Sequence, residues 1–188
     1  LGIDLGWYDD ALVAVGFNKH LKQCYILKHY KVNKQDITGL CVHVEQFRSE
    51  FNPYLIVMDT GALGRKIADE ITNRYKIPII AAEKQRKAEF IELFNDHLRQ
   101  NLIKIKKGSD ISEEMELLCW NDDKFRDGVY EENKDTPNHC CDAALYAWRY
   151  IFNYLYEPEI DPFDMTNPSE KRMLYRMQEE NKKQEYEE

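Results

Sequence analysis

The protein has 188 residues, of which 34 are acidic and 26 are Lys or Arg, giving a net charge of −8. This length suits one α/β domain with an appendage and leaves too little chain for two independent domains. Because 43% of the residues are hydrophobic and 12% aromatic, the chain can form a packed core, which excludes wholesale disorder. Its apolar runs are far shorter than the roughly 20 residues that cross a bilayer, so we expect no membrane contact.

Charge and proline content divide the chain near residue 156. Residues 157–188 hold ten acidic and five basic side chains and three prolines, which leaves residues 1–156 with a net charge of −3. We therefore expect one domain over 1–156 and a charged tail over 157–188 that could form a short docking helix. The small charge of the domain does not exclude a DNA partner, because bound metal ions add local positive charge.

Cysteine usage and the first residue also bear on the class of protein. The five cysteines are odd in number and lack a CxxC spacing, so they predict neither a disulfide framework nor a zinc ribbon and indicate a reducing cytoplasm. The chain does not begin with Met, and we expect it to be a piece of a longer protein.

Three apolar segments open the chain. Residues 2–6, 11–17 and 23–32 are rich in β-branched or aromatic side chains, which predicts three successive strands. A turn at residues 18–20 would join the second strand to the third and produce an antiparallel meander.

The remaining pattern alternates between helical and strand periods. The predicted elements, in chain order, are a helix over 37–51, a strand over 54–58, a helix from about 63 to 75, a strand over 77–82, a helix over 84–100, a short strand over 102–105, a helix over 113–120, a charged loop over 122–138 and a helix over 140–155. This order predicts an α/β fold in which an antiparallel hairpin side is continued by parallel strands, with helices on both faces of the mixed sheet.

Three aspartates and a histidine stand where such a fold places functional groups. Asp4 lies within a buried strand, where an unpaired carboxylate costs several kcal/mol, and Asp59 ends another strand at the carboxyl edge of the sheet. Asp142 follows His139 by three residues on the last helix, so the two share a face if the helix includes both. Oxygen ligands with one imidazole suit Mg²⁺ or Mn²⁺.

Three segments of the sequence resemble the metal motifs of a known nuclease family. They are Gly2–Gly6, Leu55–Gly64 and His139–Trp148, and they are similar to the motifs of the nuclease domain of the large terminase subunit of tailed bacteriophages. The resemblance spans about residues 2–152. It implies an RNase H-like fold, related to RuvC and integrases, and an endonuclease that cuts concatemeric viral DNA during genome packaging.

The resemblance also implies ligands and partners. It assigns Asp4, Asp59 and Asp142 as catalytic metal ligands and His139 as an additional ligand, holding two Mg²⁺ or Mn²⁺ ions. The implied partners are double-stranded DNA, an N-terminal packaging ATPase domain of the same polypeptide, the portal protein and the small terminase subunit. The implied location is the cytoplasm of the infected bacterium.

Basic residues could contact DNA phosphates at two places, although a solvated surface is the more usual setting for such residues. These residues are Lys84, Arg86 and Lys87 in one cluster and Lys104, Lys106 and Lys107 in the other.

Other functions remain open at this stage. A RuvC-type Holliday-junction resolvase shares the expected fold, and so does a non-catalytic docking domain. A sugar kinase or actin-like ATPase can open with a similar first strand, but it needs glycine-rich phosphate loops that this sequence lacks. Taken singly, Asp59 and Asp142 could simply cap or begin helices; their combination with Asp4 favours a metal site.

Overall fold

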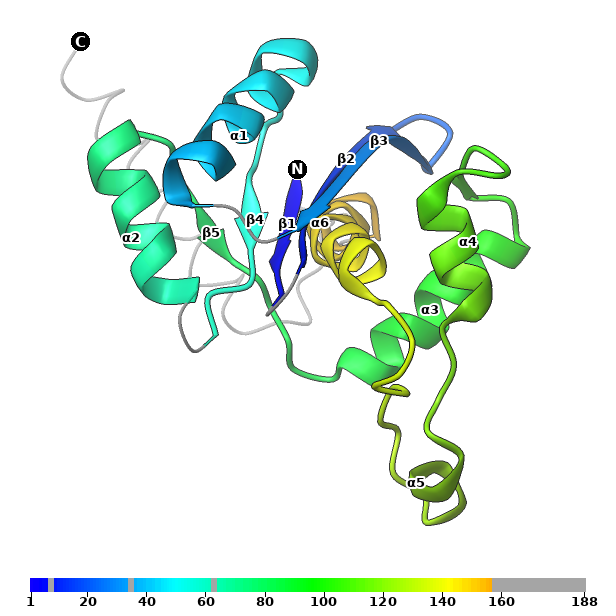
Figure 1. Cartoon of the computed structure of the whole chain (residues 1–188). Coiled ribbons are helices and arrows are strands. Elements are labelled where there is room, and N and C mark those ends of the chain that lie inside the picture. The colour runs from blue at the N-terminus through cyan, green and yellow to red at the C-terminus, as the bar shows by residue number, and fades with distance from the viewer. Residues whose placement is uncertain (7–8, 34–35, 62–63, 157–188) are drawn as a thin grey trace, which may run out of the picture. The chain divides into compact units, whose positions relative to one another are not determined.

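A computed structural model describes residues 1–6, 9–33, 36–61 and 64–156 of the chain. The expected tail over 157–188 lies outside the described residues. The described part forms one unit, Leu1–Leu155, built around a mixed sheet with helices on both faces, as Figure 1 shows. None of the helices in these described ranges is long and apolar enough to cross a membrane.

The sheet has six strands in the spatial order β5-β4-β1-β2-β3-β6. The strands are β1 (Gly2–Leu5), β2 (Asp9–Asn18), β3 (Gln23–Asn33), β4 (Val57–Met58), β5 (Ile80–Ala81) and β6 (Ile103–Lys104). The first three are antiparallel neighbours, β4 pairs parallel with β1, and β5 pairs parallel with β4. This confirms the predicted mixed sheet. The short strand expected over 102–105 pairs parallel with β3 and so forms the opposite edge.

Different helices pack on the two faces of the sheet (Figure 1). One core cluster joins α1 (Ile37–Phe51) and α2 (Gly64–Tyr75) to the sheet through Ile3, Leu12 and Met58. The other joins the last helix, α6 (His139–Tyr156), to the opposite face through Ala11 and Val13. Successive strand residues point to opposite faces, so the alternation places Asp4 on the α6 face.

Several helix boundaries differ from the prediction. The α3 helix (Lys87–Arg99) begins three residues later than expected, because Arg86 adopts a left-handed backbone conformation before it. The α4 helix covers Asp110–Leu117 and starts early because Ser109 and Ser112 form a capping box. The charged loop contains a short helix, α5 (Asp122–Arg126).

The contact between α6 and β1 is unusually close. A Cβ atom added to Gly2 would lie 1.8 Å from the backbone oxygen of Ala143, and Ala143 and Ala144 are fully buried. Small side chains on both elements therefore bring the first turns of α6 directly over β1. This approach places the amino-terminal turn of α6 beside Asp4.

Candidate active site

A buried Asp4 and a partly buried His139 form a pair where α6 meets β1. The Asp4 side chain is 8% exposed, and its Oδ2 lies 2.7 Å from Nδ1 of His139, the first residue of α6. A Cβ atom at Gly6 would lie 2.2 Å from the His139 ring, so glycine leaves the space that the imidazole fills. The hydrogen bond to Asp4 raises the pKa of His139 above its ordinary value, although burial opposes the charge.

Asp59 lies, like Asp4, at the carboxyl end of its strand, and the two strands are parallel neighbours. Its backbone N–H donates to the Ile3 carbonyl at 3.1 Å, directly after β4, which runs parallel to β1. The Oδ1 atom accepts a hydrogen bond from the Gly61 N–H at 2.8 Å, and Oδ2 lies 2.5 Å from Nζ of Lys84. The turn and the ammonium group together fix the orientation of this carboxylate.

Asp142 shares one ammonium ion with a second carboxylate. Nζ of Lys87 lies 2.7 Å from Oδ1 of Asp142 and 2.7 Å from Oε2 of Glu132. The Asn138 amide donates to the same Glu132 oxygen at 3.2 Å. Burial raises the pKa of Asp142 to about 7, and this effect outweighs the opposing charge of Lys87.

Tyr146 lies on the same helix as His139 and Asp142. Tyr146 lies one turn after Asp142 on α6 and is 2% exposed. Burial raises the pKa of its hydroxyl far above the ordinary value, and four negative side chains add to the rise: Asp142, Asp4, Asp59 and Glu132. The structure thus puts Asp4 in contact with His139, Asp59 directly after β4 beside β1, and Asp142 one turn after His139 on α6. Glu132 joins Asp142 through Lys87.

The donor set fits a divalent metal ion in its chemistry. Carboxylate oxygens and one imidazole nitrogen suit Mg²⁺ or Mn²⁺, and the ammonium groups of Lys84 and Lys87 show that these carboxylates already attract cations. As arranged, no three His, Cys, Asp or Glu side chains within the described ranges lie close enough to share one ion. Lys84 contacts Asp59, and Lys87 contacts Asp142.

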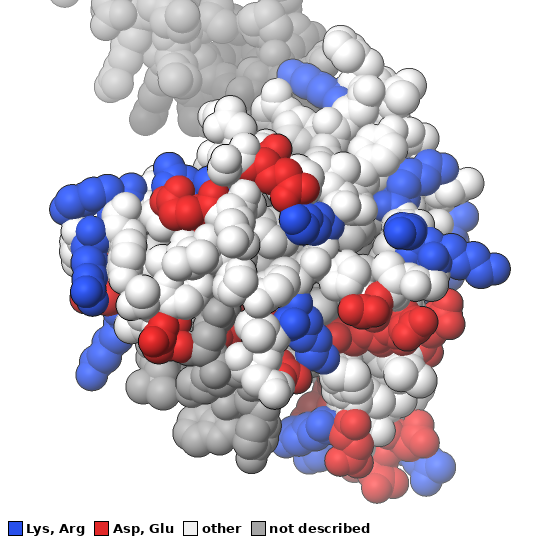
Figure 2. Space-filling view, turned by 45° about the horizontal axis from the view of Figure 1, so that its top comes forward, with Lys and Arg blue, Asp and Glu red and all other residues white. Residues whose placement is uncertain are grey.

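The lysines and arginine predicted to contact DNA lie in three settings. Lys84 and Lys87 bind site carboxylates, and Arg86, the residue before α3, pairs with Glu89 in its first turn. The other predicted cluster, residues 104–107, begins in β6 at the opposite edge of the sheet, so the fold does not bring it to the site. On the face seen in Figure 2, basic and acidic side chains of the described residues are interleaved and form no continuous basic track.

Arg149 is an additional residue that positions this site. Its guanidinium donates to the carbonyls of Glu83 at 2.7 Å and Gln85 at 3.0 Å and lies 3.8 Å from the ring centroid of Phe90. It thereby fixes the segment that carries Lys84 and leads into Lys87. Arg149 was not predicted from the sequence, although residues 139, 142, 146 and 149 follow one face of a helix.

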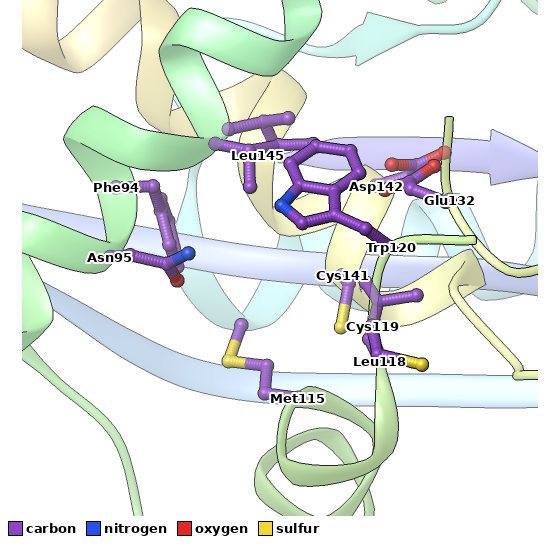
Figure 3. Close-up of a pocket in the computed structure, with 11 residues that line it drawn as sticks. Phe94, Asn95, Met115, Leu118, Cys119, Trp120, Glu132, Cys141, Asp142 and Leu145 are labelled. Atoms are coloured by element: carbon purple, nitrogen blue, oxygen red, sulfur yellow. The ribbon is translucent and has the colours of Figure 1, made fainter. Parts of the chain in front are cut away.

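Glu132 was also missed, and it borders a cavity of about 130 Å³ beside the site. Figure 3 shows Glu132 and Asp142 together at one end of this cavity. Its apolar walls come from α3, α4 and α6, and the residues that form them include Phe94, Met115 and Leu145. The acid-rich loop of the sequence gave no signal that distinguishes Glu132 from its neighbours.

An antiparallel meander continued by parallel strands, with acids at adjacent strand ends and on a closing helix, defines the RNase H-like nuclease fold. Two solved nuclease domains of bacteriophage large terminases share it. The P22 domain has a TM-score of 0.65 and 14% identity, covering 81% of this chain and 79% of that one. The g2p domain of SPP1, solved with bound Mn, has a TM-score of 0.55 and 19% identity, covering 79% and 84%.

A longer large terminase, from a thermophilic bacteriophage, is similar as well. Its structure has a TM-score of 0.67 and 14% identity, with 82% of this chain covered. This chain spans 38% of the length of that protein. No protein-family model and no curated protein sequence matches the chain. At these identities the comparisons confirm the predicted resemblance to terminase nuclease domains at the level of the fold.

Proposed function

We propose that the chain is the nuclease domain of a terminase large subunit, a metal-dependent endonuclease that cuts concatemeric viral DNA during genome packaging. One observation carries the proposal: on an RNase H-like sheet, Asp4 contacts His139, Asp59 follows the strand beside β1, and Asp142 lies one turn after His139 on α6. Under this proposal residues 1–156 form the nuclease domain. Double-stranded DNA, a packaging ATPase domain in the same polypeptide, the portal protein and the small terminase subunit are the partners, in the cytoplasm of the infected host.

The metal ions in this proposal are two Mg²⁺ or Mn²⁺ ions, held by Asp4, Asp59, Asp142 and His139. The bound Mn of the SPP1 domain supports the use of a divalent ion. Such ions neutralise charge at a phosphodiester and activate water for its hydrolysis. The protein supplies a rigid arrangement of ligands, because each carboxylate stands on a strand end or a helix packed against the sheet.

The surrounding residues hold the ligands in place. The His139 ring orients the buried Asp4 carboxylate, and the Gly61 N–H fixes one oxygen of Asp59. Lys84 and Lys87 keep positive charge beside the carboxylates, where a phosphate group would approach once cations are bound. These contacts orient the individual side chains in the metal-free protein.

Plasmid digestion tests the proposal. The wild-type chain should nick or cut supercoiled DNA with Mg²⁺ or Mn²⁺ and lose this activity in a chelator. Asp4→Asn should abolish cleavage in a protein that remains folded by circular dichroism, because it removes a central ligand. Asp123→Asn is the matched control, since the Asp123 side chain is 94% exposed and lies in α5. Wild-type cleavage by folded Asp4→Asn would contradict the assigned mechanism, and no cleavage by the wild type would indicate a non-catalytic domain.

A further inference from the structure

Lys87 stands between two carboxylates that come from different parts of the chain. Its Nζ contacts both oxygens of Asp142, at 2.7 and 2.8 Å, and Oε2 of Glu132 at 2.7 Å. The three side chains are mostly buried, with exposed fractions of 27% for Lys87, 11% for Asp142 and 17% for Glu132. One cation therefore links the first residue of α3, the first turn of α6 and the loop between α5 and α6.

The position of this ammonium is set by the backbone around it. Arg149 binds the carbonyls of Glu83 and Gln85 just before α3, and a left-handed residue, Arg86, turns the chain into the helix. The Asn138 amide supports the Glu132 carboxylate from the other side. The Lys87 ammonium therefore has one position, between the carboxylates of Asp142 and Glu132. A surface lysine, in contrast, samples many rotamers.

Charge balance indicates that the space between Asp142 and Glu132 favours a divalent cation over a single ammonium group. One ammonium group neutralises only half the charge of two carboxylates, whereas a divalent cation neutralises all of it. The neighbouring carboxylate of Asp4 adds negative charge at Asp142 and so increases the attraction for the higher charge. A divalent ion that reaches Asp142 therefore competes directly with Lys87.

We propose that Glu132 is a fourth carboxylate of the metal site and that Lys87 is the cation that Glu132 and Asp142 hold until a divalent metal displaces it. This inference rests on the proposed function. It assigns Glu132 a role toward the metal that the three sequence motifs do not include. It also gives Lys87 an effect on metal affinity that is opposite in sign to the effect of the ligands.

Titration with Mn²⁺, followed by the electron paramagnetic resonance of the free ion, measures this directly on the 188-residue chain. Glu132→Gln should weaken Mn²⁺ binding by about tenfold or more. Lys87→Met should tighten it by about fivefold or more, because the competing charge is removed while the apolar stem remains. Glu131→Gln and Lys134→Met are matched controls, since Glu131 and Lys134 form an ion pair in the same loop and the Lys134 side chain is 83% exposed. Both variants should bind Mn²⁺ as the wild type does.

A measurement on the wild type covers the case in which a variant fails to fold. Acetylation of lysines, read by mass spectrometry, should modify Lys87 slowly in the metal-free protein and faster when Mn²⁺ is added. The exposed Lys134 serves as the internal reference for reagent reactivity. Unchanged Lys87 acetylation on metal binding contradicts displacement.

The outcomes separate this inference from the function on which it rests. If neither the wild type nor Lys87→Met binds Mn²⁺, the proposed function and the inference are both overturned. If Mn²⁺ binds and Asp4→Asn removes binding, but Glu132→Gln and Lys87→Met titrate as the wild type does, the inference alone is overturned.

Discussion

Replacing Gly2 with alanine tests the close contact between β1 and α6. The added Cβ would lie 1.8 Å from the Ala143 carbonyl oxygen and 2.7 Å from its carbon, whereas ordinary van der Waals contacts begin near 3.4 Å. Both atoms belong to helix backbone, which cannot rotate away as a side chain can. The helix must therefore move, and overpacking of this kind costs about 3 kcal/mol, at the upper end of the usual range.

Chemical denaturation of the metal-free protein measures this cost. For a domain of this size, about 3 kcal/mol corresponds to a fall of roughly 6–12 °C in Tm. Gly16→Ala in β2 is the matched control, because its Cβ would meet only the flexible end of Leu27, at 2.9 Å. The control should change the free energy of unfolding by less than about 1 kcal/mol, since alanine also suits a strand interior better than glycine.

The same substitution should impair function more than stability alone explains. Oδ2 of Asp4 on β1 lies 2.7 Å from Nδ1 of His139 on α6, and displacement of the helix separates these two atoms. In folded Gly2→Ala we expect weaker Mn²⁺ binding, while Gly16→Ala binds as the wild type does. A Gly2→Ala protein with unchanged stability and unchanged metal affinity would refute the reasoning about this interface.

Three further predictions concern side chains away from β1. Arg149→Met should destabilise the protein by about 2–4 kcal/mol in denaturant, because it removes the two hydrogen bonds from the buried guanidinium to the carbonyls of Glu83 and Gln85; a loss below about 1 kcal/mol would show that water replaces the guanidinium. In the native chain only Cys119 should react with a thiol reagent at neutral pH, whereas all five cysteines should react after unfolding. The other four cysteines are buried in the native chain, and burial raises the pKa of Cys24 and Cys140 to about 12. In chelator, the stability of the wild type relative to Asp142→Asn should fall as the pH rises from about 5 to about 7. Burial raises the pKa of the folded Asp142 to about 7, so over this range the native state retains a proton that the unfolded state releases. A difference in stability that does not change with pH would contradict that shift.

The sequence predicted those elements whose ends carry local signals. The α1 helix has the predicted bounds because Asp36 caps it and Asn52 turns the chain before Pro53. The convergence of Asp4 and Asp59 also followed from topology, since parallel neighbouring strands end at one edge. The start of α3 was wrong because a non-glycine residue, Arg86, takes the left-handed conformation there, which composition does not reveal.

Glu132 could not be predicted for a different reason. It lies in a loop that is acidic throughout, and a loop has no period that assigns side chains to a face. Only the fold shows that this carboxylate turns inward to Lys87 while Glu131, its neighbour, pairs with Lys134 at the surface. The ion pairs of Lys84 and Lys87 were equally hidden, since the sequence shows a basic cluster but not the acids that face it.

The α6 helix carries the groups of the site along a single rigid element, from His139 through Asp142 and Tyr146 to Arg149. A rise of about 1.5 Å per residue sets His139 and Arg149 roughly 15 Å apart along the axis, with no loop between them to absorb a change. One inserted residue between Asp142 and Arg149 would rotate the second half of the helix by about 100° and turn Arg149 away from the segment that bears Lys84. A chain that keeps this site must therefore keep its histidine, aspartate and arginine at the same spacing along the helix.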